Sequence, residues 1–378
     1  MKSKIKNSVF LSFIYIHLIT VFTKLMSLFV KQDGKLIVFA SFSGRQISDS
    51  PLAIYNIIRN DPSFKDYRLV WLISRSLNKN ADQLGIVHAR FGGLKHWYWL
   101  IKAKYWVSNS SIDRFVPIKF KNTVYFNTWH GTPWKIIGPE EKNISPLVRN
   151  WYKKVCFDYL TLNGEYDCSV FKNVFPNTKD YLKIGLPRNY LLKKTVKSTE
   201  IKSFFEKYNL DNNKKTVLYA PTFRDYSVAN DLAYLSKKEL ELIADKYNLL
   251  IRSHYNDSFK SSKKFHNVSA ENINILFHIA DFMISDYSSI MFDFAITNKP
   301  VISIAKDFDL YSRNRGFFFD EKKMPFPILK KFEFNAIQKQ FSIAPKNVEN
   351  FIGFLNPKLG VKKIKSILSG KSFKKRSN

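Results

Sequence analysis

The stretch FMISDYSSIMFDFA, residues 282–295, holds an apolar run, a polar turn and a second apolar run. The first run, Phe282–Ser285, has the length and composition of a buried strand, and Ile290–Ala295 continues as a helix would. The turn between them holds Asp286, Ser288 and Ser289. A strand that passes through a short turn into a helix is typical of parallel sheets, so the sequence predicts an α/β fold.

The same alternation of apolar runs and amphipathic stretches extends through most of the chain. A first group of predicted strands comprises Leu36–Ser41, Leu69–Ser74, Ile86–Ala89, Tyr105–Ser108, Val124–Thr128 and Tyr159–Leu162. A second group comprises Thr216–Ala220, Leu249–Ser253, Asn267–Ser269, Phe282–Ser285 and Val301–Ile304. Helices are predicted at Ser50–Asn60, Leu94–Ala103 and Tyr166–Val174.

The two groups of strands are separated by Leu191–Lys215, which is charged, rich in Asn and without a strand pattern. It is expected to form an exposed helix and a connector between two domains. The predicted organisation is a membrane-associating segment 1–34, a domain 35–195, a domain 196–357 and a basic tail 358–378.

The composition is that of a large globular protein with a strong positive charge. Of 378 residues, 45% are hydrophobic, and 61 Lys and Arg against 31 Asp and Glu give a net charge of +30. Such a charge favours anionic partners, such as phosphorylated substrates or anionic lipid. Cys156 and Cys168 are too few for a disulfide scaffold, so a reducing, cytosolic location is expected.

Both ends of the chain are basic. Lys2, Lys4 and Lys6 precede the apolar stretch Val9–Val30, and we expect an interfacial helix on the cytosolic leaflet. A helix packed on the protein and a true membrane span are the alternatives, although Lys24 leaves only 17 uncharged residues before it. The segment 358–378 has eight basic residues and no acidic one, which fits either a solvated tail or a membrane contact.

Open α/β sheets bind ligands beyond the carboxyl ends of their strands, and polar residues follow several predicted strands here. The first loop reads WHGTP and contains His130, Gly131 and Thr132. A histidine is a general base at neutral pH, and glycine lets the backbone approach a ligand closely. A structural role for His130 is the alternative.

Two further loops carry cations. In YAPTFRD, Thr222 and Arg224 are suited to phosphate oxygens, although Arg224 and Asp225 could form only a surface pair. In IRSH, Arg252 and His254 are two residues apart and leave the predicted strand on the same face. A cation and an imidazole that converge in this way suit phosphoryl chemistry.

The SDYSS turn offers backbone N–H groups and hydroxyls at a helix start, which is an anion site without a metal. The alternative is that these residues only cap the helix. Asp293 could bind a ribose or face solvent. The chain lacks the P-loop, HExxH and GxSxG motifs, and the pair Asp307 and Asp309 is a weak metal signal that more often marks a turn.

Seven motifs occur in the order seen in the CDP-glycerol glycerophosphotransferase family, which includes teichoic acid primases and polymerases. They are WHGTP, GLPRN (185–189), YAPTFRD, RSH, SDYSSIMFDFA, KPVI (299–302) and RGFFFD (315–320). The resemblance implies a GT-B type pair of Rossmann-like domains with a cleft between them. It also implies transfer of glycerol phosphate from CDP-glycerol to a hydroxyl of a lipid-linked acceptor, with release of CMP.

The resemblance further implies roles for individual residues. His130 is expected to accept the proton of the acceptor hydroxyl, and His254 to face the transferred phosphate. The expected substrate-binding residues are Gly131, Thr132, Arg188, Thr222, Arg224, Arg252, Ser285, Asp286, Ser288, Ser289 and Asp293. No metal cofactor and no dependence on Mg²⁺ are expected, because protein donors suffice for phosphoryl transfer.

The expected partners are CDP-glycerol, a polyprenyl-diphosphate-linked glycan and the anionic surface of the cytoplasmic membrane face, and not nucleic acid. The chain has Tyr255 where family members often have Pro, and Ile304 and Ala305 where an aromatic residue is frequent, which could change the donor to CDP-ribitol. Two other classes fit less of the sequence: a sugar transferase of the same fold, and a noncatalytic basic protein that binds membranes or nucleic acid.

Overall fold

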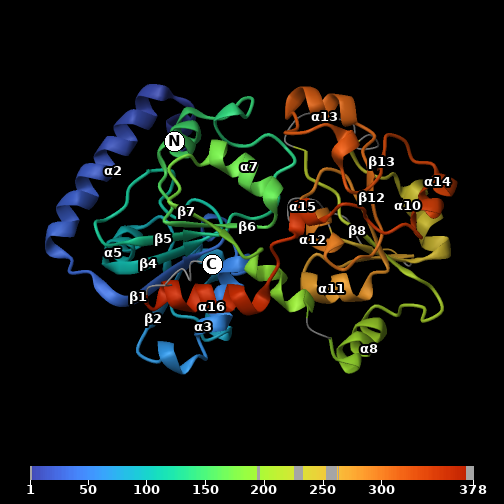
Figure 1. Cartoon of the computed structure of the whole chain (residues 1–378), viewed down its shortest axis with the longest axis horizontal. Coiled ribbons are helices and arrows are strands. Elements are labelled where there is room, and N and C mark those ends of the chain that lie inside the picture. The colour runs from blue at the N-terminus through green and yellow to red at the C-terminus, as the bar shows by residue number, and fades with distance from the viewer. Residues whose placement is uncertain (1, 194–195, 225–232, 253–261, 263, 372–378) are drawn as a thin grey trace, which may run out of the picture. The chain divides into compact units, whose positions relative to one another are not determined.

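The computed structural model describes residues 2–193, 196–224, 233–252, 262 and 264–371. The chain forms two compact units. Unit 1 comprises the residues up to His130, Ile137–Tyr190 and the described residues from Gly353 onward, and unit 2 comprises Gly131–Ile136 and the described part of Leu191–Ile352. Each unit is built on one parallel sheet, as the alternation of strands and helices predicted (Figure 1).

The sheet of unit 1 has seven strands in the order β3-β2-β1-β4-β5-β6-β7. The strands are β1 (Asp33–Ala40), β2 (Arg68–Ile73), β3 (His88–Arg90), β4 (Ala103–Ser108), β5 (Val124–Asn127), β6 (Tyr159–Leu162) and β7 (Asp180–Lys183). Six of them match predicted runs. The edge strand β7 was not predicted, because only one of its four residues is buried.

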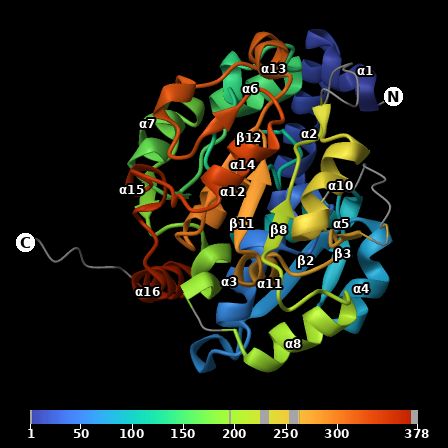
Figure 2. The same ribbon diagram turned by 90° about the vertical axis from the view of Figure 1, so that its right-hand side faces the viewer.

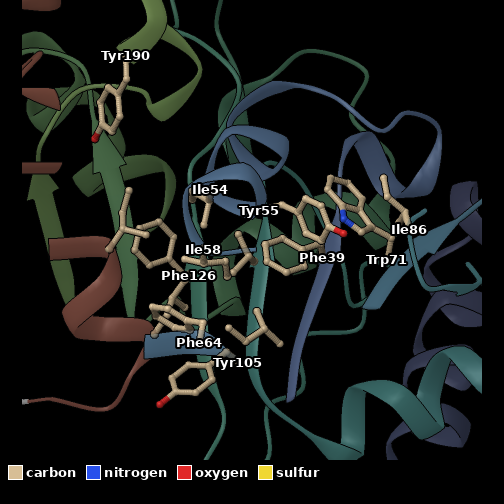
Figure 3. Close-up of a cluster of buried hydrophobic side chains, with 14 of the residues drawn as sticks. Phe39, Ile54, Tyr55, Ile58, Phe64, Trp71, Ile86, Tyr105, Phe126 and Tyr190 are labelled. Carbon is tan, nitrogen blue, oxygen red and sulfur yellow. The ribbon is translucent and has the colours of Figure 1, made fainter. Parts of the chain in front are cut away.

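The main core of unit 1 lies between this sheet and helix α3 (Asp49–Ile58). Figure 3 shows its aromatic centre, where Phe39 stacks on Trp71 with ring centroids 5.5 Å apart and Tyr55 packs edge-on against Phe39. Fully burying one such side chain contributes about 1.5–3 kcal/mol to folding. This core therefore fixes the strands whose carboxyl ends carry the candidate site.

The C-terminal residues add a helix to the same core. Helix α16 (Pro357–Leu368) lies beside α3 and buries Ile364 and Leu368 (Figure 2). The basic composition from residue 358 onward predicts a tail, whereas the structure has this packed helix there. Lys365 pairs with Asp61, so part of the basic charge serves the fold.

The N-terminal helices α1 (Lys2–Asn7) and α2 (Val9–Phe29) pack on helix α6 (Pro146–Lys154), and α2 also contacts α5 (Leu94–Lys102). The polarity of α2 is the reverse of that expected for a helix of a water-soluble protein. Its polar residues Ser12 and Thr23 are buried, whereas Phe10 and Phe13 are 70% and 66% exposed. In Figure 1, α2 (dark blue) lies at the edge of its unit.

The sheet of unit 2 has six strands in the order β10-β9-β8-β11-β12-β13. They are β8 (Thr216–Tyr219), β9 (Asn248–Ile251), β10 (Phe265–Asn267), β11 (Phe282–Ser285), β12 (Val301–Ile304) and β13 (Ile328–Leu329). Helices α10 (Lys237–Lys246) and α14 (Phe334–Gln340) pack on one face (Figure 2). Helix α12 (Ile290–Ala295) contacts β11 and β12 and follows β11 as predicted.

The remaining elements connect these layers. The other α-helices are α4 (Asn78–Gln83), α7 (Glu165–Val174), α8 (Ser198–Lys207), α11 (Ile273–Ile279), α13 (Phe308–Asn314) and α15 (Glu349–Ile352). The 3-10 helices are η1 (Phe42–Gly44), η2 (Pro62–Phe64), η3 (Arg75–Leu77), η4 (Gly138–Glu140), η5 (Pro187–Lys193) and η6 (Glu321–Lys323). Helix α8 lies in the predicted connector.

Both sheets have a position at which the strand order reverses. In unit 1 it lies between the neighbours β1 and β4, and in unit 2 between β8 and β11. The chain leaves such a pair of strands in opposite directions, which opens a crevice at their carboxyl ends, where α/β proteins bind ligands. The polar loops discussed next follow these strands.

Candidate functional site

The ring of His130 lies at the reversal point of unit 1. Its Nδ1 atom is 2.7 Å from the backbone oxygen of Asn109, which follows β4. A carbonyl oxygen can only accept a hydrogen bond, so Nδ1 carries the hydrogen in this contact. In the neutral ring the lone pair is then on Nε2, which is the arrangement that a general base requires.

Two aromatic rings flank this imidazole. The centroid of the Trp129 ring lies 4.3 Å from the centroid of the imidazole. The ring of Phe42, a residue that follows β1, has its centroid 5.5 Å away. The Phe42 N–H in turn donates to the Asn109 side-chain oxygen at 2.8 Å. The loops after β1, β4 and β5 are therefore joined around His130.

The backbone around His130 is strained. Among the described residues, ten other than glycine have a positive φ angle, and four of these are Asn, which tolerates it. The other six are Phe42, Ser43, Asp49, Arg114, Phe115 and Trp129. All six belong to the loops that contact His130 or its partners, and each costs of order 1–3 kcal/mol. Local sequence gave no signal for this strain, because residues such as Trp and Phe rarely adopt that conformation.

Arg188 supports the same loop from the GLPRN motif. Its guanidinium donates to the backbone oxygen of His130 at 3.1 Å and pairs with Asp49, and both of these side chains are largely buried. The sequence predicted that Arg188 binds substrate. The structure adds that it holds the backbone of His130, and Asp49 was not predicted at all.

In unit 2, Arg224 lies at the reversal point between β8 and β11. The sequence predicted that it binds phosphate oxygens. In the structure its five N–H groups donate within the protein, to the oxygens of Thr222 and Ala233, to Asp286 and twice to Asp307. Its side chain is 3% exposed, so this guanidinium holds the loops together, and its contact with phosphate oxygens stays a prediction.

Asp286 and Asp307 complete this buried network. Asp286 accepts the N–H of Thr222 at 2.9 Å, and Asp307 accepts the Tyr287 hydroxyl at 2.8 Å. Burial alone would lower the pKa of Arg224, but the two carboxylates outweigh it and hold that pKa above its ordinary value. The DxD pair predicts that Asp307 is part of a turn, whereas Asp307 links the loops after β8, β11 and β12.

Ser285 also belongs to this framework, because its hydroxyl donates to the oxygen of Ala220 on the loop after β8. Lys299 of the KPVI motif has a similar role. Its ammonium group donates to the oxygens of Phe277, His278 and Ala280 at the end of α11, and burial lowers its pKa. Ser285 therefore fixes the sheet edge on which the SDYSS turn stands, and Lys299 fixes the end of α11 at the start of β11.

The hydroxyl groups of Ser288, Ser289 and Thr222 lie at the same edge but, unlike that of Ser285, are not part of this framework. Ser288 and Ser289 are partly exposed, and Ser289 stands at the N-cap of α12 without making a side-chain capping bond. The hydroxyl of Thr222 is buried and has no hydrogen-bond partner among the described residues. Capping alone therefore does not account for Ser289, and all three hydroxyls suit an anionic ligand.

The other predicted site residues are more scattered. Arg252 follows β9 and donates to the oxygen of Glu271 at 2.9 Å, and Asp293 is buried on α12. Gly131 and the buried Thr132 belong to the short segment of unit 2 that follows His130, and this segment is fixed by Trp134, which stacks on Phe317. His254 lies outside the described residues, as do Asp225 and Tyr255.

The described part of the chain holds no group of three or more His, Cys, Asp or Glu side chains placed to bind a metal ion. Asp307, the first residue of the only DxD pair, is occupied by Arg224. The functional groups at both reversal points are thus an imidazole, hydroxyls and backbone amides, with buried ion pairs behind them.

The sequence profile described as "CDP-Glycerol:Poly(glycerophosphate) glycerophosphotransferase" matches residues 22–344. The chain is 33% identical over 347 residues to a teichoic acid poly(glycerol phosphate) polymerase of Bacillus spizizenii, covering 85% of this chain and 87% of that protein. It is 32% identical over 324 residues to a teichoic acid glycerol-phosphate transferase of Staphylococcus aureus, covering 79% and 81%.

Solved structures of the wall teichoic acid polymerase TagF have the same fold. One superimposes with a TM-score of 0.73 at 26% identity, and the match covers 96% of this chain and 98% of the chain in that structure. A histidine-to-asparagine variant of TagF soaked with CDPG superimposes with a TM-score of 0.72 at 26% identity and covers 90% of each chain.

Proposed function

The chain belongs to the CDP-glycerol:poly(glycerophosphate) glycerophosphotransferase family, and we propose that it transfers glycerol phosphate from CDP-glycerol to a hydroxyl of a lipid-linked teichoic acid or capsule acceptor, releasing CMP. The observation that carries this proposal is the contact between His130 Nδ1 and the Asn109 oxygen, which leaves a basic Nε2 at a ligand-binding edge. The solved TagF complex with CDPG supports the choice of donor.

In the proposed reaction, Nε2 of His130 takes the proton of the acceptor hydroxyl. The acceptor oxygen forms a bond to the phosphorus that carries glycerol, and the bond from that phosphorus to the bridging oxygen breaks. CMP leaves with the electron pair of that bond. Because phosphoryl transfer mainly requires orientation and stabilised oxygens, the hydroxyls of Thr222, Ser288 and Ser289 would supply the protein's part at the diphosphate.

We assign the acceptor to unit 1 and the donor to unit 2, in a GT-B type arrangement. Two parallel sheets with the same kind of strand order and the similarity to TagF support this assignment. The buried network of Arg224, Asp286 and Asp307 would keep the donor loops in place. His254 would face the transferred phosphate, as the family resemblance implies.

The proposed location is the cytoplasmic face of the membrane, with α2 lying in the interface. Helix α2 is long and apolar enough to cross a membrane. Its most apolar stretch of 18 residues has a mean hydropathy of 1.8, and only 11% of that stretch is buried in the protein. Ser12 and Thr23 lie on the side of α2 that is buried in the protein, and the exposed Phe10 and Phe13 would enter the lipid. The net charge of +30 would add attraction to anionic headgroups.

The test is a reaction of the purified chain with CDP-glycerol and a lipid-linked disaccharide. We expect the mass of the acceptor to increase by whole glycerol phosphate units, with one CMP formed for each unit. Parallel reactions offer CDP-ribitol, UDP-sugars and GDP-sugars. Preference for CDP-ribitol would reassign the donor, and turnover of a sugar nucleotide would indicate a glycosyltransferase.

The same reaction run with EDTA tests the proposal that no metal takes part. We expect activity to persist. Complete loss of activity that Mg²⁺ restores would contradict it and would direct attention to Asp309 and the residues around it.

A further inference from the structure

The loop Asn109–Phe115, which follows β4, sets the position of His130. Asn109 uses two oxygens for this purpose: its backbone oxygen faces His130 Nδ1 at 2.7 Å, and its side-chain oxygen accepts the Phe42 N–H at 2.8 Å. Asn109 is fully buried. The orientation of the imidazole therefore depends on where this loop holds one carbonyl group.

The middle of the loop is held by hydrogen bonds from β4, from β5 and from the loop after β1. The oxygen of Ser110 accepts bonds from Ser108 at 2.8 Å, Asn127 at 3.1 Å and Tyr125 at 3.2 Å. From the loop after β1, the Ser43 hydroxyl donates to the backbone oxygen of Ser111 at 3.0 Å. These contacts hold the loop against the sheet of unit 1.

Asp113 fixes the loop on its other side. Its carboxylate is fully buried and accepts the Ser111 hydroxyl at 2.6 Å and the indole N–H of Trp151, on α6, at 2.9 Å. The Ser111 hydroxyl in turn accepts the N–H of Phe115 at 2.7 Å. Asp113 thus closes the loop on itself and ties it to a helix.

A buried carboxylate is a costly way to hold a loop. Burial raises the pKa of Asp113 to about 7, although the hydrogen bonds from Ser111 and Trp151 act to lower it. Left-handed backbone at Arg114 and Phe115 adds to the cost. Strain of this kind persists where the surrounding structure enforces it, and it concentrates at functional sites.

We propose that Asp113 is a positioning residue for the reaction: by holding the loop Asn109–Phe115, it keeps the Asn109 oxygen against Nδ1 and so keeps His130 in the tautomer that has its lone pair on Nε2. The proposal rests on the proposed role of His130 as the base. It concerns the geometry of the base, and Asp113 itself does not touch substrate.

The direct test is ¹⁵N NMR of protein labelled in its histidine rings, with the His130 signals assigned by their loss in His130→Gln. Spectra are recorded above the ordinary histidine pKa of about 6.5, where the rings are neutral. We expect Nδ1–H in the wild type and a shift of His130 toward Nε2–H in Asp113→Ala. Turnover should fall by about 10²-fold, as expected for a misplaced group, while CDP-glycerol affinity is kept.

Two further variants test the role of hydrogen bonding. In Asp113→Asn, the amide oxygen can accept the Trp151 N–H and the amide N–H can donate to Ser111, so the tautomer should be restored to Nδ1–H. In Ser43→Gly, the contacts of the Ser43 hydroxyl with the Ser111 oxygen and the Ser110 hydroxyl are lost. Because Ser43 has a φ of 55°, glycine suits its backbone and folding should be preserved even if Asp113→Ala does not fold.

The matched control is Asp158→Ala. Asp158 is also a largely buried carboxylate of unit 1, and it accepts bonds from Lys119 and from the Tyr125 N–H, but at the amino end of β6. It should lower stability without moving the His130 tautomer. The proposal is wrong if Asp113→Ala folds and leaves His130 in the Nδ1–H form. If Asp113→Ala does not fold, the proposal is wrong when Ser43→Gly leaves His130 in that form.

These outcomes are independent of the proposed function. If His130→Gln retained full turnover, the role of His130 as base would be lost. The tautomer shift in Asp113→Ala would still report whether Asp113 positions the ring.

Discussion

Asp307 accepts two hydrogen bonds from Arg224, from Nε at 2.8 Å and from Nη2 at 2.9 Å, although 83 residues separate the two in the sequence. The pair is buried, with side chains 1% and 3% exposed. Breaking a buried pair leaves one charge without its partner, which costs about 3–5 kcal/mol.

Asp307→Asn and Arg224→Lys should therefore lower the free energy of unfolding by several kcal/mol and weaken donor binding. Urea unfolding and calorimetry with CDP-glycerol would measure the two effects. Asp66→Asn is the control, because Asp66 pairs with Lys35 on the surface, where a pair contributes about 1 kcal/mol or less. If Asp66→Asn lowered the free energy of unfolding as much as Asp307→Asn and Arg224→Lys do, the Arg224 network would have no special role.

His130→Ala should reduce turnover by about 10²–10⁴-fold and leave CDP-glycerol affinity nearly unchanged. A base acts on the transition state far more than on ground-state binding. Steady-state rates combined with calorimetry would separate the two effects. His88→Gln, at a histidine that pairs with Asp82, is the control and should leave the rate unchanged. Activity of His130→Ala within a few-fold of the wild type would remove this residue from the mechanism.

The double variant Ser288→Ala and Ser289→Ala should weaken CDP-glycerol binding, because two hydroxyl contacts to the diphosphate are lost. Each hydrogen bond to a charged group contributes about 1.5–3 kcal/mol. Ser342→Ala removes an exposed hydroxyl elsewhere in unit 2 and serves as the control. An unchanged dissociation constant for the double variant would mean that both serines only begin helix α12.

Replacing Phe10 and Phe13 by Gln should release the protein from anionic liposomes in a sedimentation assay. Both rings are exposed, so the fold should be unaffected, while each apolar side chain that enters the interface contributes up to about 1.5–3 kcal/mol. High salt should weaken the remaining electrostatic attraction further.

The control for the liposome assay replaces Leu242 and Ile343, which are exposed apolar residues of unit 2, by Gln. If the Phe variant stays bound at high salt and only detergent releases it, α2 spans the membrane and the interfacial arrangement is wrong.

The stability of unit 1 should fall as the pH is lowered from about 6.5 toward about 3, because of His96. This side chain is fully buried against Phe91 and Trp97, and burial, with the charge of Arg114, lowers its pKa to about 3. In that range the unfolded chain binds a proton at His96 and the folded chain does not, so up to about 1.4 kcal/mol is lost per pH unit.

Urea unfolding of the wild type and of His96→Gln across this range would isolate the effect. The comparison is needed because Asp113, whose pKa is raised in the folded protein, changes stability in the opposite direction. Its contribution to the free energy of unfolding is lost as the pH rises from about 3.9 to about 7. Equal pH dependence in the two proteins would show that His96 takes up its proton in the folded state.

Much of the fold follows from local sequence. The strands Tyr159–Leu162 and Phe282–Ser285 have the predicted bounds, because a buried strand between turns has a distinct composition. The strands β7 and β13 were missed because edge strands are short and half exposed. In α16 the charge of the lysines concealed a helix, although Gly360, Ile364 and Leu368 recur at a spacing of four on its buried side.

The site was predictable only in part. His130 and the SDYSS turn could be predicted because they follow predicted strands, and parallel sheets bind ligands at the carboxyl ends of their strands. The partners of these residues were not predictable, since Asn109, Asp49 and Asp307 come from distant loops and have no motif of their own. For Arg224, residue type suggested phosphate, which stays a prediction, whereas its burial between two carboxylates was not predictable.

The return of α16 to unit 1 has a consequence for how the chain folds during synthesis. Tyr105 and Tyr190 share their core with Ile364 and Leu368, so this core stays open until the ribosome has translated past residue 368. The described strands of unit 2 end at Leu329 and have all left the ribosome by then. Because α2 precedes the strands of both sheets in the chain, it leaves the ribosome before them and can reach lipid while the unit that carries it is still unfinished. Attachment to the membrane would then precede the completion of unit 1, and a chaperone or the membrane surface itself would have to shield its exposed aromatic residues in the interval.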